Sequence, residues 1–116
     1  MNESVAIVLP VRDCTSTVEN LIHTWCNALA NLGRAWELVI VDDGSTDGTT
    51  SKLDTVKRPN VRVLKHTAPQ GQGACLRTAL EGIEHPLVLL AGAGYIVSFL
   101  AGRHDSLLAR RLALHA

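Results

Sequence analysis

The stretch Leu38-Val39-Ile40-Val41-Asp42-Asp43-Gly44-Ser45 decides the fold, because a continuous apolar run ends abruptly in two carboxylates and a turn. A run in which consecutive residues are apolar is typical of a strand that is buried on both faces. Similar runs occur at 5–9, before Pro10, and at 87–90, after Pro86, and a further strand pattern at 61–64 contains Arg62. The sequence therefore predicts about four buried strands.

Helical patterns separate these strands. The first follows Ser16-Thr17-Val18-Glu19, which predicts a capping box with Ser16 as the N-cap, and it ends near Gly33. A shorter helix is expected from about Asp47 to Val56, and a third opens at Gly71-Gln72-Gly73. Alternating strands and helices predict an α/β fold of three layers, a Rossmann-like half-domain with about four parallel strands.

The bulk composition excludes several classes of protein. A chain of 116 residues forms one domain, and a formal net charge of zero argues against a nucleic-acid partner. The odd count of cysteines, Cys14, Cys26 and Cys75, indicates a reducing compartment. No signal sequence opens the chain, so we expect a cytoplasmic location. Pro86 and the glycines near 92–102 argue against a membrane-spanning helix in the uncharged stretch that follows His85.

The chemistry is expected where the strands end. In open α/β sheets, ligands bind at the carboxyl ends of the strands, which here carry the loops 10–13, 42–45 and 91–94. Asp42 and Asp43 are costly to bury without a partner, and the hydroxyls of a ribose or an N–H of a base would be suitable ones. Alternatively, the two carboxylates cap the following helix together with Ser45 and Thr46. The residues alone leave both interpretations open.

Two longer strings add a resemblance. Ala6-Ile7-Val8-Leu9-Pro10-Val11-Arg12, then Val41-Asp42-Asp43-Gly44-Ser45-Thr46-Asp47-Gly48-Thr49, resemble the opening of family 2 glycosyltransferases, and 61–64 with 71–77 resemble the next block. The likeness covers about residues 4 to 91. Within the family, these motifs are similar to those of dolichyl-phosphate mannose synthases and of bacterial relatives that act on lipid-linked acceptors. It implies the GT-A fold and the N-terminal half of such an enzyme, which binds a nucleotide-activated sugar.

The resemblance also implies boundaries, partners and site residues. Residues 1–95 would form the nucleotide-sugar-binding domain, truncated relative to the family, and 96–116 a tail with a short strand and a helix. The partner would be a UDP- or GDP-linked sugar. Full-length relatives transfer the sugar to a lipid or saccharide acceptor, and the chain would be peripheral at the inner membrane face. The residues that would line the nucleotide-sugar site are Pro10, Val11, Arg12, Val41, Asp42, Asp43, Gly71, Gly73, Gly92, Ala93 and Gly94.

One departure from the family changes the expected chemistry. Relatives carry an Asp-any-Asp motif that coordinates Mg²⁺ or Mn²⁺ after the fourth strand, whereas this chain has Gly92-Ala93-Gly94. The family's second half, with its catalytic base, is also largely absent. We therefore expect no metal, no cofactor, no catalytic residue and no sugar transfer by this chain alone. An active transferase without the metal motif, a non-catalytic nucleotide-binding or interaction module, and a gene fragment without function remain as alternatives.

Two further expectations concern association and metal. Residues 87–91 form an uncharged apolar strand, which would self-associate along its free edge unless a short strand at 96–100 covers that edge. The histidines show no metal-ligand spacing with cysteine or acid, so none is expected to bind a metal. A dinucleotide-binding protein and a phosphoacceptor receiver domain are rejected, because the glycine and aspartate motifs follow the wrong strands.

Overall fold

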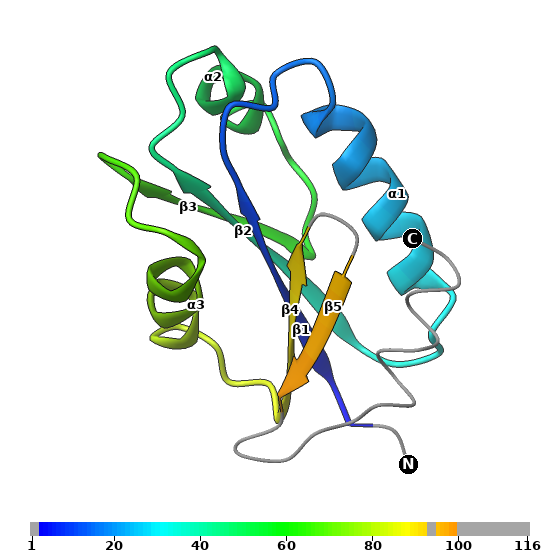
Figure 1. Ribbon diagram of the computed structural model, residues 1–116. Coiled ribbons are helices and arrows are strands. Elements are labelled where there is room, and N and C mark those ends of the chain that lie inside the picture. The colour runs from blue at the N-terminus through cyan, green and yellow to red at the C-terminus, as the bar shows by residue number, and fades with distance from the viewer. Residues whose placement is uncertain (1–2, 93–94, 100–116) are drawn as a thin grey trace.

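A computed structural model describes residues 3–92 and 95–99 of the chain. Its sheet has five strands in the order β3-β2-β1-β4-β5 (Figure 1). The first four strands are parallel to one another and β5 runs antiparallel to β4. The elements are β1 (Val5–Val11), α1 (Val18–Ala30), β2 (Trp36–Asp43), α2 (Thr49–Leu53), β3 (Val61–His66), α3 (Gln72–Leu80), β4 (Leu87–Gly92) and β5 (Tyr95–Phe99).

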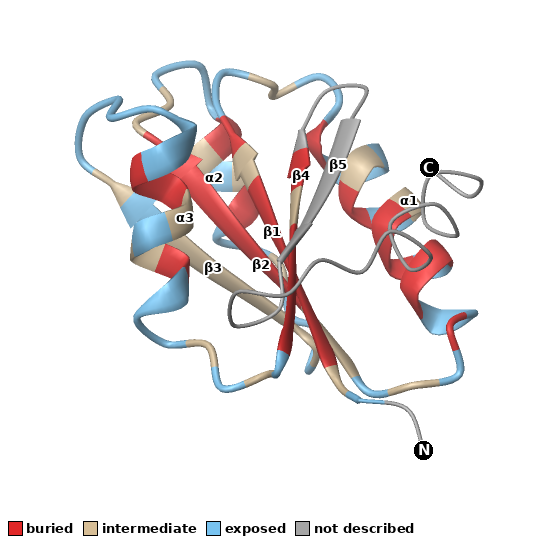
Figure 2. Cartoon of the chain, turned by 60° about the horizontal axis from the view of Figure 1, so that its bottom comes forward, coloured by how far each residue is buried: buried red, intermediate tan, exposed pale blue. Residues whose placement is uncertain are grey.

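Strands β1, β2 and β4 are largely buried because helices cover both faces of the sheet, while β3 is half-buried (Figure 2). Successive side chains of a strand point to opposite faces. Ile7, Ile40 and Leu89 accordingly pack in a core with α1, while Val8 and Val39 pack in a second core with α3. The three-layer α/β fold with four parallel strands that the sequence predicts is confirmed.

The start of α1 differs from the prediction. Thr17, not Ser16, precedes the helix, and no side chain caps its first turn. Glu19 lies 3.5 Å from the ammonium of Lys52 instead of reaching back to the helix start. The predicted capping box is therefore wrong, because the helix begins one residue later than predicted and Glu19 stands at its second position instead of its third. Gly33 has φ +71° just beyond the helix, as a left-handed stop requires.

The fourth strand is not an edge strand. Its residues pair with β1 on one side and with β5 on the other, where Val88 is opposite Phe99 and Gly92 opposite Tyr95. The short covering strand expected at 96–100 is present at 95–99, so the free edge expected for self-association is absent from β4. Within the part of the chain that the structure describes, no helix has the length and apolar character needed to cross a membrane.

Candidate functional site

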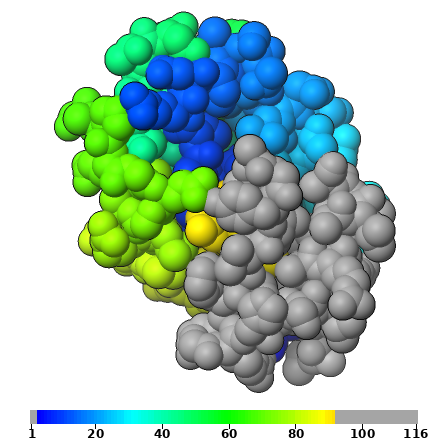
Figure 3. All heavy atoms as spheres, in the orientation of Figure 1, coloured from blue at the N-terminus to red at the C-terminus, as the bar shows by residue number. Residues whose placement is uncertain are grey.

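The register of the sheet brings the predicted polar residues to one edge. Val11 at the end of β1 is paired with Asp42, and Asp43 is paired with His66 at the end of β3. The space-filling view shows the blue atoms of the β1–α1 segment beside the green atoms of the segments that follow β2 and β3 (Figure 3). The two carboxylates of β2 therefore stand between two neighbouring strand ends, as the sequence predicts.

Asp42 serves the turn that follows its own strand. Its side chain accepts a hydrogen bond from the backbone N–H of Ser45 at 3.2 Å and another from the hydroxyl of Thr50. The residue is 1% exposed. This geometry matches the interpretation that Asp42 caps the segment leading into α2.

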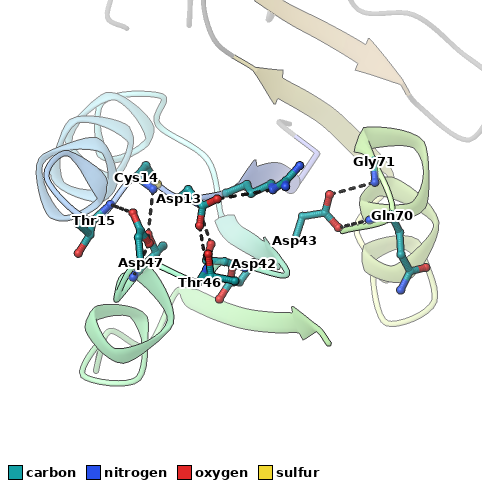
Figure 4. A network of polar contacts seen from close by, with 12 residues as sticks. Asp13, Cys14, Thr15, Asp42, Asp43, Thr46, Asp47, Gln70 and Gly71 are labelled. Atoms are coloured by element: carbon teal, nitrogen blue, oxygen red, sulfur yellow. Dashed lines mark hydrogen bonds and ion pairs between the residues drawn. The ribbon is translucent and has the colours of Figure 1, made fainter. Parts of the chain in front are cut away.

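Asp43 points to the opposite face and holds the loop before α3 (Figure 4). Its Oδ1 accepts hydrogen bonds from His66 Nδ1 at 2.8 Å and from the backbone N–H of Gln70 at 2.9 Å. Its Oδ2 accepts from the backbone N–H of Gly71 at 2.9 Å. Burial raises the pKa of Asp43, but His66 and the two amides outweigh burial and lower the pKa to about 2. Asp43 is therefore ionised at neutral pH and fixed in place.

A network that the sequence analysis missed ties the β1–α1 loop to the β2–α2 loop (Figure 4). Asp13 accepts from the backbone N–H of Thr46 at 2.8 Å, and its own N–H donates to Ser45 Oγ at 2.9 Å. Asp47 accepts from the backbone N–H of Thr15 at 3.1 Å and from both the N–H and the hydroxyl of Thr49. These hydrogen bonds fix the relative position of the two loops.

Only a weak sequence signal marks this network. Asp47-Gly48-Thr49 has the spacing at which an aspartate accepts from the amide two residues on. Asp13 has φ +49° in the structure, a conformation that aspartate tolerates better than most residues, but the sequence does not predict it there. The spacing of Asp47 and Thr49 does not identify the partner loop, which lies more than thirty residues away in the sequence.

The remaining predicted residues differ in what their positions require. Arg12 is exposed and lies 3.7 Å from Asp13, so its charge faces solvent at the carboxyl edge. Gly71 has φ +94°, which explains a glycine there. A Cβ at Gly73 would meet only an ordinary contact at 3.5 Å, so the backbone does not demand that glycine. Gly92 is the last residue of β4, while Ala93 and Gly94 lie outside the described residues.

The described residues contain one group of three side chains of metal-ligand type. Asp43, His66 and Cys75 come together between β2, β3 and α3, with their ligand atoms all within 4.8 Å of one another. Burial, and next the charge of Asp43, raise the pKa of the Cys75 thiol to about 11. The thiol is therefore protonated at neutral pH in the absence of a cation.

Comparison with known proteins gives the fold a family. The model of glycosyl transferase family 2 matches residues 6–93. Undecaprenyl-phosphate 4-deoxy-4-formamido-L-arabinose transferase from Salmonella paratyphi B is 36% identical over 51 residues, which are 44% of this chain and 16% of that protein. This chain therefore spans only a small part of its curated relatives.

Solved structures agree with this result. S. aureus TarS in complex with UDP-GlcNAc is 25% identical, with a TM-score of 0.61 over 76% of this chain and 26% of its own. A mannosyltransferase of Pyrobaculum calidifontis in complex with GDP-Man and Mn²⁺ is 22% identical, with a TM-score of 0.62 over 77% of this chain and 27% of its own. The fold, the strand-end motif and the family match agree, and the chain belongs to glycosyl transferase family 2.

Proposed function

We propose that this chain binds the nucleoside diphosphate part of a nucleotide-activated sugar at the carboxyl edge of its sheet, and that it does not transfer the sugar by itself. The observation that carries the proposal is the ionised Asp43 at the end of β2, beside the end of β1, in a family 2 chain. The TarS structures with UDP and with UDP-GlcNAc, which match three quarters of the chain, support this choice of ligand.

The chemistry of the edge suits a nucleotide. A carboxylate offers about four acceptor positions, and three hydrogen bonds to Asp43 are described above. The Cys75 thiol also hydrogen-bonds this carboxylate, so a ribose hydroxyl or a base N–H would reach it at the exposed tenth of the side chain by sharing or replacing one of these bonds. Arg12, whose side chain is 58% exposed, supplies a cation that can meet a phosphate. Because Asp43 is fixed before the ligand arrives, binding does not have to order this side chain.

Binding is proposed to be weak and nearly independent of Mg²⁺ or Mn²⁺. Hard cations bind to oxygen ligands, and the sequence offers no oxygen-bearing side chain at 92–94. Without a cation, the diphosphate leaving group of a nucleotide sugar keeps its charge, and transfer is not assisted. The same lack of a metal ligand accounts for the metal-independent binding and for the missing transfer of the sugar.

Calorimetry tests the proposal directly. UDP-sugars and GDP-sugars are titrated into the chain in EDTA and again with Mn²⁺. We expect a measurable affinity that changes less than tenfold between the two conditions; a larger gain with Mn²⁺, above about 1.4 kcal/mol, contradicts metal independence. No heat from any nucleotide sugar at millimolar concentration contradicts binding.

Matched variants locate the site. Asp43→Asn and Arg12→Gln should each weaken nucleotide binding, while the control Lys57→Gln should not, because Lys57 is an exposed residue just before β3, at the opposite end of the sheet. Equal loss in all three variants contradicts a site at the carboxyl edge.

The double variant Gly92→Asp with Gly94→Asp should introduce dependence on Mn²⁺, since it adds two carboxylates at the end of β4.

The cellular place of the chain is part of the same proposal. The name of the Salmonella relative includes undecaprenyl phosphate, a lipid. We therefore propose that the chain is cytoplasmic and meets the inner face of the membrane peripherally. Fractionation tests this: the chain should separate from membranes in high salt, and retention until detergent is added contradicts it.

A further inference from the structure

The buried group formed by Asp43, His66 and Cys75 has no role in the proposed nucleotide chemistry as a unit. Its members come from β2, β3 and α3, which meet at the carboxyl edge. Cys75 has no exposed surface, and the side chains of Asp43 and His66 are 10% and 6% exposed. The group is thus closed toward the protein and accessible only from the Asp43–His66 side.

We propose that Asp43, His66 and Cys75 bind one Zn²⁺ ion. A carboxylate oxygen of Asp43, Nδ1 of His66 and Sγ of Cys75 are the three protein ligands, and a water completes the tetrahedron from the accessible side. Carboxylate, imidazole and thiolate are the ligand types that zinc takes in proteins. The proposal goes beyond nucleotide binding and does not depend on it.

The spacing of the ligand atoms fits this ion after small rotations of the side chains. Zinc lies about 2.3 Å from sulfur and about 2.0–2.2 Å from nitrogen and oxygen, so that neighbouring ligands of a tetrahedron are about 3.3–3.6 Å apart. The 2.8 Å between His66 Nδ1 and Asp43 Oδ1 opens by about half an ångström. No pair exceeds 4.8 Å, and the longer pairs involve the sulfur, so the largest closure needed is about 1.2 Å.

Thr78 is placed to hold the imidazole in the tautomer that a metal needs. Its hydroxyl lies 2.8 Å from His66 Nε2. In the tautomer that carries its proton on Nδ1, His66 donates to Asp43, and the hydroxyl of Thr78 donates to Nε2. When the ion binds Nδ1, the ring proton is on Nε2 and donates to Thr78 Oγ1, because a hydroxyl can accept as well as donate. Such a partner for the second nitrogen is the usual support of a zinc-bound histidine.

The charges balance in the bound state. The Cys75 thiol releases its proton to solvent, and the imidazole binds the ion in its neutral form, with the ring proton on Nε2. One thiolate and one carboxylate then neutralise the two charges of Zn²⁺, which suits a buried site. A sulfur and a nitrogen among three ligands favour Zn²⁺ over Mg²⁺ or Mn²⁺. The site is therefore compatible with nucleotide binding that does not depend on Mg²⁺ or Mn²⁺.

Cobalt titration gives a spectroscopic test. The chain, reduced and freed of metal, is titrated with Co²⁺, and Zn²⁺ is then added to displace it. We expect one equivalent of Co²⁺ to produce the thiolate-to-cobalt absorption of a tetrahedral site, and Zn²⁺ to abolish it and raise the Tm. Absence of the thiolate band up to millimolar Co²⁺ overturns the proposal.

Cysteine variants assign the sulfur. Cys75→Ser should lose the thiolate band, whereas Cys26→Ser should keep it, because Cys26 is also a buried cysteine but packs in the other core. A band that persists in Cys75→Ser overturns the assignment. If Cys75→Ser does not fold, as judged by circular dichroism, His66→Gln decides, since it keeps all three thiols: affinity for Co²⁺ should fall tenfold or more, and unchanged affinity overturns the site. No nucleotide is present here and no metal in the EDTA calorimetry, so either proposal can fail alone.

Discussion

The two sides of the carboxyl edge are held together in different ways. On the α2 side, Asp13 and Asp47 join the loops that follow β1 and β2, and Asp42 holds the turn between β2 and α2. On the α3 side, Asp43 alone accepts from the two backbone amides that lead into α3. We call these the α2-side network and the α3-side anchor. The first divides its hydrogen bonds among several residues, while the second concentrates them on one, so single substitutions should affect the two sides unequally.

The largest effect is expected at the α3-side anchor. Asp43→Ala removes the carboxylate that accepts from His66 and from two backbone amides, which should lower the free energy of unfolding by about 3 kcal/mol. Asp54→Ala is the control, since it removes an exposed carboxylate paired with Lys65 and should cost about 0.5 kcal/mol. Urea denaturation measures both, and similar losses in the two variants would refute the comparison.

A pair of glycines tests how closely the two sides approach each other. Gly44 and Gly33 have φ of +72° and +71°, but a Cβ at Gly44 would lie 2.6 Å from backbone atoms of Ala68 and Pro69, while a Cβ at Gly33 would meet nothing within 4 Å. Gly33→Ala should cost about 1 kcal/mol for backbone strain. Gly44→Ala should cost about 2 kcal/mol more, because the loop before α3 must move. Equal costs would show that this loop gives way freely.

Acid should weaken the anchor within a defined range. The pKa of Asp43 is lowered from 3.8 to about 2 in the folded chain, so its contribution is fully present above pH 3.8 and is lost as the pH falls through about 2. The shift corresponds to ~2 kcal/mol. Denaturation curves between pH 2 and 6 should show this loss in the natural chain and not in Asp43→Asn, and parallel curves would contradict it.

The smallest effect is expected in the α2-side network. Asp47→Asn weakens acceptance from Thr15 and Thr49, but Asp13 still joins the same loops, so the Tm should fall only slightly. Amide exchange should separate the two sides. Asp47→Asn should speed exchange at Thr15 and Thr49 without changing Gln70 and Gly71, and Asp43→Asn should do the reverse. Exchange that rises on both sides in one variant would mean that they act as one unit.

Several elements were predictable because they depend on residues close in sequence. The apolar runs around Ile7, Ile40 and Leu89 form buried strands, since only a strand covered on both faces removes so many consecutive apolar side chains from water. The error at the start of α1 has the opposite origin. Glu19 suited a local cap, but the helix begins at Val18, which leaves Glu19 one position too early. The loop before the helix is held by Asp47 and Thr49 of a distant segment, which a local pattern does not contain.

The candidate site shows the same division. The motif that ends in Asp42-Asp43 placed both carboxylates at the carboxyl edge, because parallel strands bring like ends together. The motif does not show that Asp42 and Asp43 point to opposite faces of the sheet with different partners. Which face each side chain takes depends on how the strand is placed between the helices. The association of Cys75 with Asp43 was equally hidden, because it requires α3 to fold back over the ends of β2 and β3.

The sequence by itself determined the fold class, the order of the elements, the family and the place of the acidic pair. Each of these follows from local periodicity or from a continuous motif. Only the tertiary structure decided that β5 covers the edge of β4, that Asp43 anchors the α3 loop, and that His66 joins Asp43 and Cys75 in one group. These contacts join residues that are far apart in the sequence. Their distance in space does not follow from that separation, because the packing of the sheet and helices sets it.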